Sequence, residues 1–351
     1  LMQWLDIVAL GTVCDVVSLT GVNRALVTQG LKVMKKRGNE GIAALADVAG
    51  LTEQPAAYHA GFVFGPRVNA GGRVGESWLG ASLLTTRDRG QAAEYAKRLD
   101  EYNQERRMIE ATCLEEAIAM EVAEATGAVM IVGSENWHPG VIGIVAGRLR
   151  ERFDRPACVI AYEGGIGKGS GRSVRGFDLG AAVVAARQAG LLEGGGGHAM
   201  AAGFTISQDN EDAFRVFIEN RINTIAGDEA LVPRYRIDGA LQAAGADLKL
   251  IQAIEQLAPF GAGNAQPRFA FPAAQIVNAA PVGENHVRCM ITGESGGRLK
   301  AISFRSLDTP LGQALLNTRG LPLHVCGTLR IDRWQGRETP QLTIEDAAAI
   351  N

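Results

Sequence analysis

Residues 194 to 203 read Gly-Gly-Gly-Gly-His-Ala-Met-Ala-Ala-Gly, and the neighbouring elements can be arranged around this stretch. Four consecutive glycines lack a Cβ atom, so the backbone there can adopt positive φ angles and approach a ligand closely. An apolar helical pattern precedes the stretch and a strand pattern follows it. A glycine turn between such elements suits an anion held by backbone N–H groups, with Gly196, Gly197 and His198 as candidate contacts. A flexible surface turn is the alternative interpretation.

The residues around this turn predict an α/β domain, because strand and helix patterns alternate along the chain. The expected strands cover 128–132, 157–162 and 203–206, and the expected helices cover 141–153, 178–189 and 210–224. Residues 168–173, Lys-Gly-Ser-Gly-Arg-Ser, are expected on a strand or turn.

The same domain carries several candidate phosphate-binding side chains, namely Lys168, Ser170, Arg172 and Ser173, although such clusters also occur in plain turns. Between residues 144 and 175, seven basic residues stand against three acidic ones, in a chain whose net charge is −3. A local basic patch of this kind lets an acidic protein contact nucleic acid. His138 precedes a helix start, where it is either a cap or a polar contact to a ligand.

A second informative stretch covers residues 61–76, Gly-Phe-Val-Phe-Gly-Pro-Arg-Val-Asn-Ala-Gly-Gly-Arg-Val-Gly-Glu. Its glycines and proline predict a stiff, tightly turning loop that fixes Arg67, Asn69 and Arg73. Two guanidinium groups placed in this way suit bidentate recognition of phosphate. The alternative is a pair of arginines whose salt bridges hold the loop in place.

The first part of the chain predicts helices. Residues 5–19 indicate a helix that runs into a glycine-containing loop, and residues 23–36 indicate a second helix. Asp15 lies among apolar residues, where a carboxylate must be paired, hydrogen-bonded or bound to metal. A capping role and a metal-ligand role both stay open. Residues 88–125 contain no proline, and their only glycine is Gly90. This pattern predicts one long helix that connects two domains.

Residues from 233 onward predict a small OB-like β-barrel with one helix, a fold suited to single-stranded nucleic acid. The expected strands cover 235–240, 268–278, 286–292, 298–304, 323–331 and 341–344, the helix covers 247–257, and a loop covers 258–267. Arg330, Arg333 and Trp334 are candidate single-strand contacts. Phe304 is either a stacking residue or part of the core.

Length and composition bound the function. A chain of 351 residues should hold two or three domains. Its five cysteines are far apart and form no Cys-x-x-Cys pair, which argues against a zinc site or disulfide framework and favours a reducing, cytoplasmic location. No apolar run reaches the roughly 18 residues that a membrane helix needs, so no membrane contact is expected. The sequence starts at Leu1 and enters an apolar pattern at once, so we expect a fragment of a longer protein.

Taken together, these stretches resemble the RecJ family of single-strand-specific exonucleases, within the DHH phosphoesterase superfamily. The resemblance covers nearly the whole chain. It rests on GTVCDVV at 11–17, GPRVNAGGR at 65–73, WHPGVIG at 137–143, SGRS at 170–173, GGGHAMAAG at 195–203 and PFGAGN at 259–264. The glycine–histidine motif alone points only to the DHH-associated domain, which also occurs in oligoribonucleases and alanyl-tRNA synthetases. The Gly-Pro-Arg-x-Asn stretch and the final barrel make RecJ the specific match.

The resemblance implies four parts. These are the remainder of a DHH domain over 1–86, a connecting helix over 87–125, a DHH-associated α/β domain over 126–228 and an OB-like domain over 229–351. It also implies that Asp15 is the last metal-ligating, catalytic aspartate of the DHH domain. Arg67 and Arg73 would line the nucleic-acid path, and Ser170 and Arg172 would hold a 5′ phosphate.

The implied function is 5′→3′ hydrolysis of single-stranded DNA in repair and recombination, with two Mn²⁺ or Mg²⁺ ions. A helicase or a single-strand-binding protein would be a further candidate partner. The family's Asp-His-His motif and most of its metal ligands do not occur in this sequence, so we expect the chain to be inactive by itself. Two alternatives stay open: a non-catalytic single-strand-binding or scaffold protein, and a DHH-type oligoribonuclease or nucleotide phosphatase.

Overall fold

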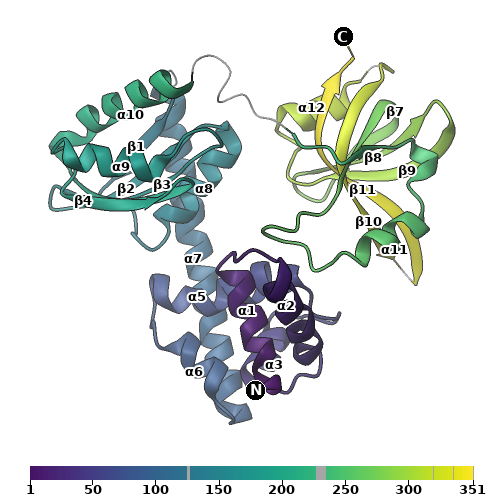
Figure 1. Cartoon of the computed structure of the whole chain (residues 1–351), viewed down its shortest axis with the longest axis horizontal. Helices are drawn as coiled ribbons and strands as arrows, with labels where there is room; N and C mark the ends of the chain where they lie inside the picture. The colour runs from purple at the N-terminus through teal and green to yellow at the C-terminus, as the bar shows by residue number, and fades with distance from the viewer. Residues whose placement is uncertain (125–126, 227–234, 319, 335, 351) are drawn as a thin grey trace. The chain divides into compact units, whose positions relative to one another are not determined.

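The computed structural model describes residues 1–124, 127–226, 235–318, 320–334 and 336–350 (Figure 1). The chain divides into two compact units. One unit consists of Leu1–Val33, Pro55–Ala60 and Tyr235–Asn351, and the other of Met34–Gln54 and Gly61–Arg234. No described helix is both long enough and apolar enough to cross a membrane.

In the second unit, short helices pack along the long helix α7 (Arg89–Glu124), which confirms the helix predicted over 88–125. The packing partners are α3 (Glu40–Val48), α5 (Gly65–Val74) and α6 (Leu79–Thr85).

The prediction of a loop over 61–76 is wrong. This segment is helical, because a π-helical turn (Ala60–Phe64) runs directly into α5. Pro66 occupies the first turn of α5, where its missing N–H costs no hydrogen bond. Gly71 and Gly75 allow close packing against α7. A Cβ on Gly71 would lie 3.3 Å from a methyl of Leu99, and one on Gly75 would lie 2.5 Å from the Tyr102 ring.

The α/β domain is confirmed. Its sheet has the order β1-β2-β3-β5-β4, in which β1 and β2 are parallel and the other neighbours antiparallel. The strands are β1 (Met130–Ser134), β2 (Ala157–Glu163), β3 (Ile166–Arg172), β4 (Gly194–His198) and β5 (Ala201–Ser207). Helices α7 and α8 (Ile142–Phe153) cover one face. Helices α9 (Leu179–Gln188) and α10 (Glu211–Ala226) cover the other.

The glycine turn predicted at 194–203 is a β-hairpin. Gly194–His198 form the edge strand β4, and only Ala199 and Met200 turn before β5. Helix α9 comes close to this strand: a Cβ on Gly180 would lie 2.8 Å from the carbonyl carbon of Gly197, and one on Gly195 would lie 2.9 Å from Val183 Cγ1. The four glycines therefore belong to a sheet edge and not to a flexible loop.

The first unit joins two helices, α1 (Leu5–Cys14) and α2 (Gly21–Met34), to a β-barrel. Both helices were predicted, although Gly11 lies inside α1 and not in a loop. The three-residue helix α4 (Ala57–His59) completes the helical part.

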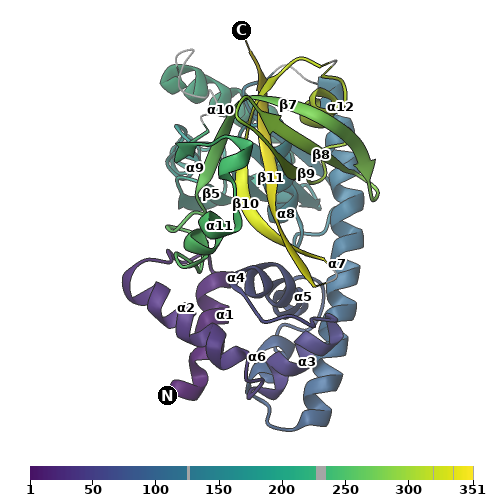
Figure 2. The ribbon, with the colours of Figure 1, turned by 90° about the vertical axis from the view of Figure 1, so that its right-hand side faces the viewer.

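The barrel confirms the OB-like prediction. Its strands follow the order β7-β8-β9-β11-β10, and β10 pairs back with β7 (Figure 2). They are β7 (Arg268–Val282), β8 (His286–Gly293), β9 (Gly296–Ser303), β10 (Leu323–Trp334) and β11 (Arg337–Ala349). Helix α11 (Leu248–Glu255) matches the predicted helix, whereas the strand predicted over 235–240 is only β6 (Gly239–Ala240). Helix α12 (Pro310–Leu316) was not predicted.

Candidate nucleic-acid interface

The first turn of α8 lies against the end of β3. A Cβ atom on Gly143 would lie 3.0 Å from Ser170 Oγ and 3.2 Å from Arg172 Nη2. No side chain caps this helix, whose N-cap is Val141, so its first N–H groups are not satisfied by a capping side chain. A helix N-terminus, a hydroxyl and a guanidinium therefore converge on one point. This combination attracts anions.

Arg172 keeps part of its hydrogen-bonding capacity for a ligand. Its Nη1 donates to Gly171 O at 2.9 Å and to Ser170 Oγ at 3.3 Å. Within the described residues, Nε and Nη2 have no hydrogen-bond acceptor, and no carboxylate acts on the charge of Arg172. Burial, and next the positive charge of Arg73, lower the pKa of Arg172. A bound anion would relieve both effects.

Arg73 and His138 shape the approach to α8. Arg73, in the last turn of α5, donates from Nη1 to Gly140 O at 3.0 Å. His138 Nδ1 accepts the N–H of Gly140 at 3.0 Å, which closes the turn before α8 without capping the helix. The structure thus brings Arg73, His138, Ser170 and Arg172 together at the start of α8.

The glycine hairpin continues this site across the sheet. The strand register aligns Ser170 with Gly203 and Gly196, and Arg172 with Ala201 and His198. Residues aligned in this way share one face of a sheet. Among the described residues, a Cβ on Gly196 would meet nothing within 4 Å, and one on Gly203 would meet only a carbonyl oxygen at 3.8 Å. The backbone at Gly196 and Gly203 therefore leaves an open surface beside Ser170, which we call the open floor. His198 is exposed at its edge.

Lys168 belongs to the same face of β3, two residues before Ser170. It is exposed, and its Nζ lies 3.4 Å from Thr205 Oγ1. Its ammonium group can therefore reach a ligand on the open floor.

Two predicted phosphate contacts on these strands have other surroundings. Ser173 is buried, and its hydroxyl donates to Phe177 O at 2.7 Å. Gly197 alternates with Gly196 and so faces the α9 side, where a Cβ would lie 2.3 Å from Ala201 O. Both residues serve local packing.

Arg67 and Asn69 do not join the α8 site through any described contact. Arg67 is half-buried and forms an ion pair with Asp100 of α7 at 2.8 Å, which is the salt-bridge alternative. Asn69 is exposed on α5. The helical conformation of this segment is the reason, because it turns Arg67 toward α7 and leaves Arg73 at the helix end.

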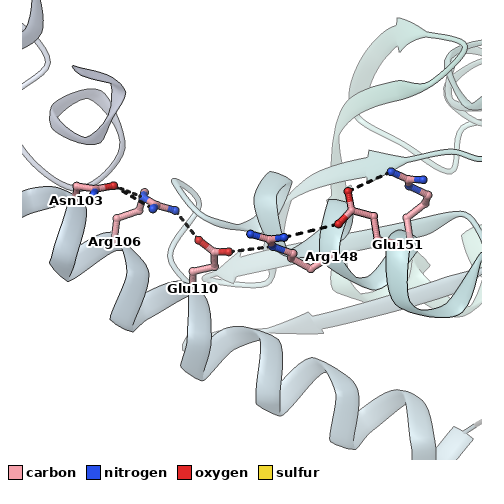
Figure 3. Close-up of polar contacts among 6 residues, drawn as sticks. Asn103, Arg106, Glu110, Arg148 and Glu151 are labelled. Atoms are coloured by element: carbon pink, nitrogen blue, oxygen red, sulfur yellow. Dashed lines mark hydrogen bonds and ion pairs between the residues drawn. The ribbon is translucent and has the colours of Figure 1, made fainter. Parts of the chain in front are cut away.

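An ion-pair network joins α7 to α8 (Figure 3). Arg106 donates to Asn103 Oδ1 at 3.0 Å and to Glu110 at 2.5 Å, and the second oxygen of Glu110 faces Arg148 at 3.5 Å. Arg148 also pairs with Glu151, as does Arg150. Arg148 and Arg150 of the predicted basic patch are therefore paired with carboxylates. The i, i+3 and i, i+4 spacing of the α7 residues was the available sequence signal.

The barrel carries a separate polar and aromatic surface. The Arg330 guanidinium lies 4.9 Å from the centroid of the Phe304 ring, and its Nε donates to Gln341 Oε1 at 2.8 Å. Phe304 is 43% exposed, so the core alternative for this ring is wrong. His286, which the sequence did not single out, meets the same ring edge-on at 5.2 Å.

The two other barrel candidates differ from Arg330. Arg333 is exposed, but its charge is balanced by Glu338 at 3.0 Å and Glu255 at 3.9 Å. The side chain of Trp334 lies outside the described part of the structure.

Asp15 is the C-cap of α1 and is exposed, so its carboxylate does not bear the burial cost that its apolar neighbours suggested. Among the described residues, no group of three or more His, Cys, Asp or Glu side chains could hold a metal ion. Asp15 alone does not fit a two-metal centre, which needs several oxygen or imidazole ligands. The buried carboxylate of α1 is instead Asp6, which is 2% exposed, and burial raises its pKa.

Comparison with known proteins identifies the two domains that carry these surfaces. Residues 124–224 match the family model of the DHHA1 domain, and residues 237–346 match that of the RecJ OB domain. The chain is 33% identical to the single-stranded-DNA-specific exonuclease RecJ of Bacillus subtilis, over 99% of this chain and 44% of that protein. It is 35% identical to RecJ of Dickeya dadantii, over 98% of this chain and 61% of that protein.

The crystal structure of Thermus thermophilus RecJ in complex with Mn²⁺ superposes with a TM-score of 0.85 at 28% identity. The match covers 100% of this chain and 50% of that one. Fold and site thus define a protein with a DHH-associated α/β domain and an OB barrel. More particularly, the chain is a homologue of RecJ and spans about half the length of the curated relatives it matches.

Proposed function

We propose that this chain binds the 5′-phosphorylated end of single-stranded DNA, as part of a metal-dependent 5′→3′ exonuclease of repair and recombination. The observation that carries the proposal is the convergence of Ser170 and Arg172 on the uncapped first turn of α8. The RecJ relatives, named as single-stranded-DNA-specific exonucleases, support the choice of substrate.

The donors at this point match a terminal phosphate. Nε and Nη2 of Arg172 form a planar fork that can bind two phosphate oxygens. Ser170 Oγ accepts a hydrogen bond from Arg172, so the proton of its hydroxyl can be donated to a third oxygen. A phosphate monoester carries between about −1.5 and −2 charges at neutral pH, more than a phosphodiester, and therefore gains more from this site.

Nucleotides beyond the end would use the open faces of each domain. The bare backbone at Gly196 and Gly203 leaves room for a sugar or base beside the phosphate, with Lys168 and His198 as donors at the rim. On the barrel, Phe304 and Arg330 offer an aromatic face and a cation, which bind successive nucleotides without reading their sequence.

Hydrolysis would require metal ligands that these residues do not supply. Asp15 stands at the C-terminus of α1, where the negative end of the helix dipole adds to its own charge and favours a cation. It would be one ligand of a Mn²⁺ or Mg²⁺ centre whose ions activate water and neutralise charge at the scissile phosphate. The 351-residue chain by itself is therefore proposed to bind single strands without cutting them.

Fluorescence anisotropy with a labelled oligothymidylate tests the proposal. The chain should bind the single strand more tightly than a duplex of equal length, and affinity should fall linearly on a log–log plot against salt. Equal affinity for the duplex would contradict the proposal. Adding Mn²⁺ should release no labelled nucleotide, and release that follows the chain through purification would show that it is active alone.

A further inference from the structure

The loop 258–264, Ala-Pro-Phe-Gly-Ala-Gly-Asn, docks onto the connection between α1 and α2, residues 15–20, within the first unit. Leu19 donates its N–H to Ala262 O at 2.6 Å. A Cβ on Gly261 would lie 2.8 Å from Leu19 Cδ1, and one on Gly263 would lie 2.6 Å from Ser18 Oγ. The two segments therefore meet so closely that neither glycine can carry a side chain without a shift.

The connection that receives this loop contains a strained residue. Val16, directly after Asp15, has a φ of +56°, in the left-handed region that β-branched residues rarely adopt. Such a conformation costs on the order of 1–3 kcal/mol. The end of α1 holds it here, because the Val16 N–H donates to Val13 O at 3.1 Å and the Val17 N–H donates to Thr12 O at 3.0 Å. Val16 is 72% exposed, so burial of its own side chain does not offset the cost. Leu19, which is 2% exposed, anchors the connection three residues later.

The loop is in turn bonded to the elements around it. Asn264 Nδ2 donates to Leu257 O at 3.0 Å and to Pro259 O at 2.9 Å, which closes the loop on itself. Gln266 donates to Leu329 O at 2.8 Å and so fixes the end of the loop to β10. From the other side, Arg24 of α2 donates to Leu257 O at 2.5 Å. The loop is thus hydrogen-bonded to the barrel on one side and to the two helices on the other, and we call this arrangement the bracket.

We propose that the 258–264 loop is a positioning element for Asp15. By holding Ser18 and Leu19, directly after the C-terminal turn of α1 that contains Val16, it fixes the path by which the chain leaves that turn and so the direction of the Asp15 carboxylate. The inference rests on the proposed function, because the role of Asp15 as a metal ligand belongs to that proposal. In these terms the barrel, besides contacting DNA, helps to build the centre that cuts it.

The test compares two glycine-to-alanine variants of the full chain. Gly263→Ala places a Cβ against Ser18 at a φ of +71°, whereas Gly296→Ala has the same kind of φ, +75°, with nothing within 4 Å. Hydrogen exchange should become at least about tenfold faster in residues 15–20 of Gly263→Ala and stay unchanged there in Gly296→Ala. The carboxyl carbon signal of Asp15, assigned with Asp15→Asn, should shift only in Gly263→Ala.

Rescue separates positioning from general damage. Ser18→Ala removes the oxygen that the new Cβ would meet, so the double variant should recover most of the protection and the original Asp15 signal. Should Gly263→Ala fail to fold, Arg24→Ala weakens the same bracket and should give the same local change. Equal effects of both alanine variants, or an unchanged Asp15 signal, would overturn the inference. None of these measurements uses DNA or metal, so a failure of strand binding does not alter their outcome.

Discussion

Arg172 in the α/β domain and Arg330 on the barrel are both arginines whose pKa is lowered by burial, but their surroundings differ. Arg172 meets a hydroxyl, a helix N-terminus and the charge of Arg73, all of which favour an added anion. Arg330 meets an amide oxygen and an aromatic ring, and the charge of Asp332 acts in the opposite direction to burial. The surroundings of Arg172 suit the extra negative charge of a terminal phosphate. The surroundings of Arg330 suit any nucleotide along the strand.

The largest expected effect is that of Arg172→Ala. Loss of charge-assisted hydrogen bonds, worth about 1.5–3 kcal/mol, should weaken binding of a 5′-phosphorylated strand by about 10- to 100-fold. Binding of the 5′-hydroxyl strand should change only a few-fold. Arg172→Lys keeps the charge without the planar fork and should fall between the two. Equal losses for both strands would remove Arg172 from a terminal-phosphate site.

Filling the space in front of Arg172 should have the next largest effect. Gly143→Ala places a methyl group 3.0 Å from Ser170 Oγ, so we expect about a tenfold loss of 5′-phosphate preference. Gly147→Ala in the same helix meets nothing within 4 Å and is the matched control. It should leave binding unchanged and stabilise α8 by up to about 1 kcal/mol in thermal unfolding. A similar loss of binding in both variants would point to the helix and not to the site.

On the barrel, Arg330→Ala should reduce affinity a few-fold for all single strands, whatever their 5′ end. The slope of affinity against salt should fall by up to about 1, as expected for one lost phosphate contact. Arg333→Ala removes a cation already paired with two carboxylates and should change the slope little. The distinction between the two arginines fails if Arg333→Ala has the larger effect.

The smallest effect is that of Asp6→Asn, which should change the stability of the first unit without changing strand binding. Because burial raises the folded-state pKa of Asp6 above its unfolded value, ionised Asp6 destabilises the first unit at neutral pH. Asp6→Asn should therefore raise the melting temperature at pH 7. The gain should disappear as the pH falls through the raised pKa and below about 4, the ordinary value for Asp. Strand affinity should not change, and a gain that grows toward low pH would refute the assignment.

Periodicity and turn signals were enough to predict most elements. The long helix α7, the α/β order and the barrel follow from patterns that one segment carries by itself. The most informative failures were the two glycine-rich stretches, which form α5 and β4 and not loops. In both, glycine serves close contact with a partner distant in sequence, such as Tyr102 or Gly180, and a local pattern cannot reveal that.

The candidate site was predicted only in part, because it too depends on contacts between residues distant in sequence. Ser170 and Arg172 stand out by residue type, but the first turn of α8 joins them only through tertiary packing. Arg67 and Arg73 look equivalent in the sequence, but α5 directs them to different partners. Arg67 pairs with Asp100, and Arg73 donates to Gly140 O. The docking of loop 258–264 could not be predicted, because it joins residues more than 230 positions apart.

The most direct test is the affinity of the wild-type chain for three oligothymidylates of equal length, with a 5′ phosphate, a 3′ phosphate or no terminal phosphate. At one fixed salt concentration, the 5′-phosphorylated strand should bind about tenfold more tightly or better, and the other two should bind alike. Equal affinity for all three strands would contradict a terminal-phosphate site at Ser170 and Arg172. A preference shared by the 3′-phosphorylated strand would show that charge alone is recognised.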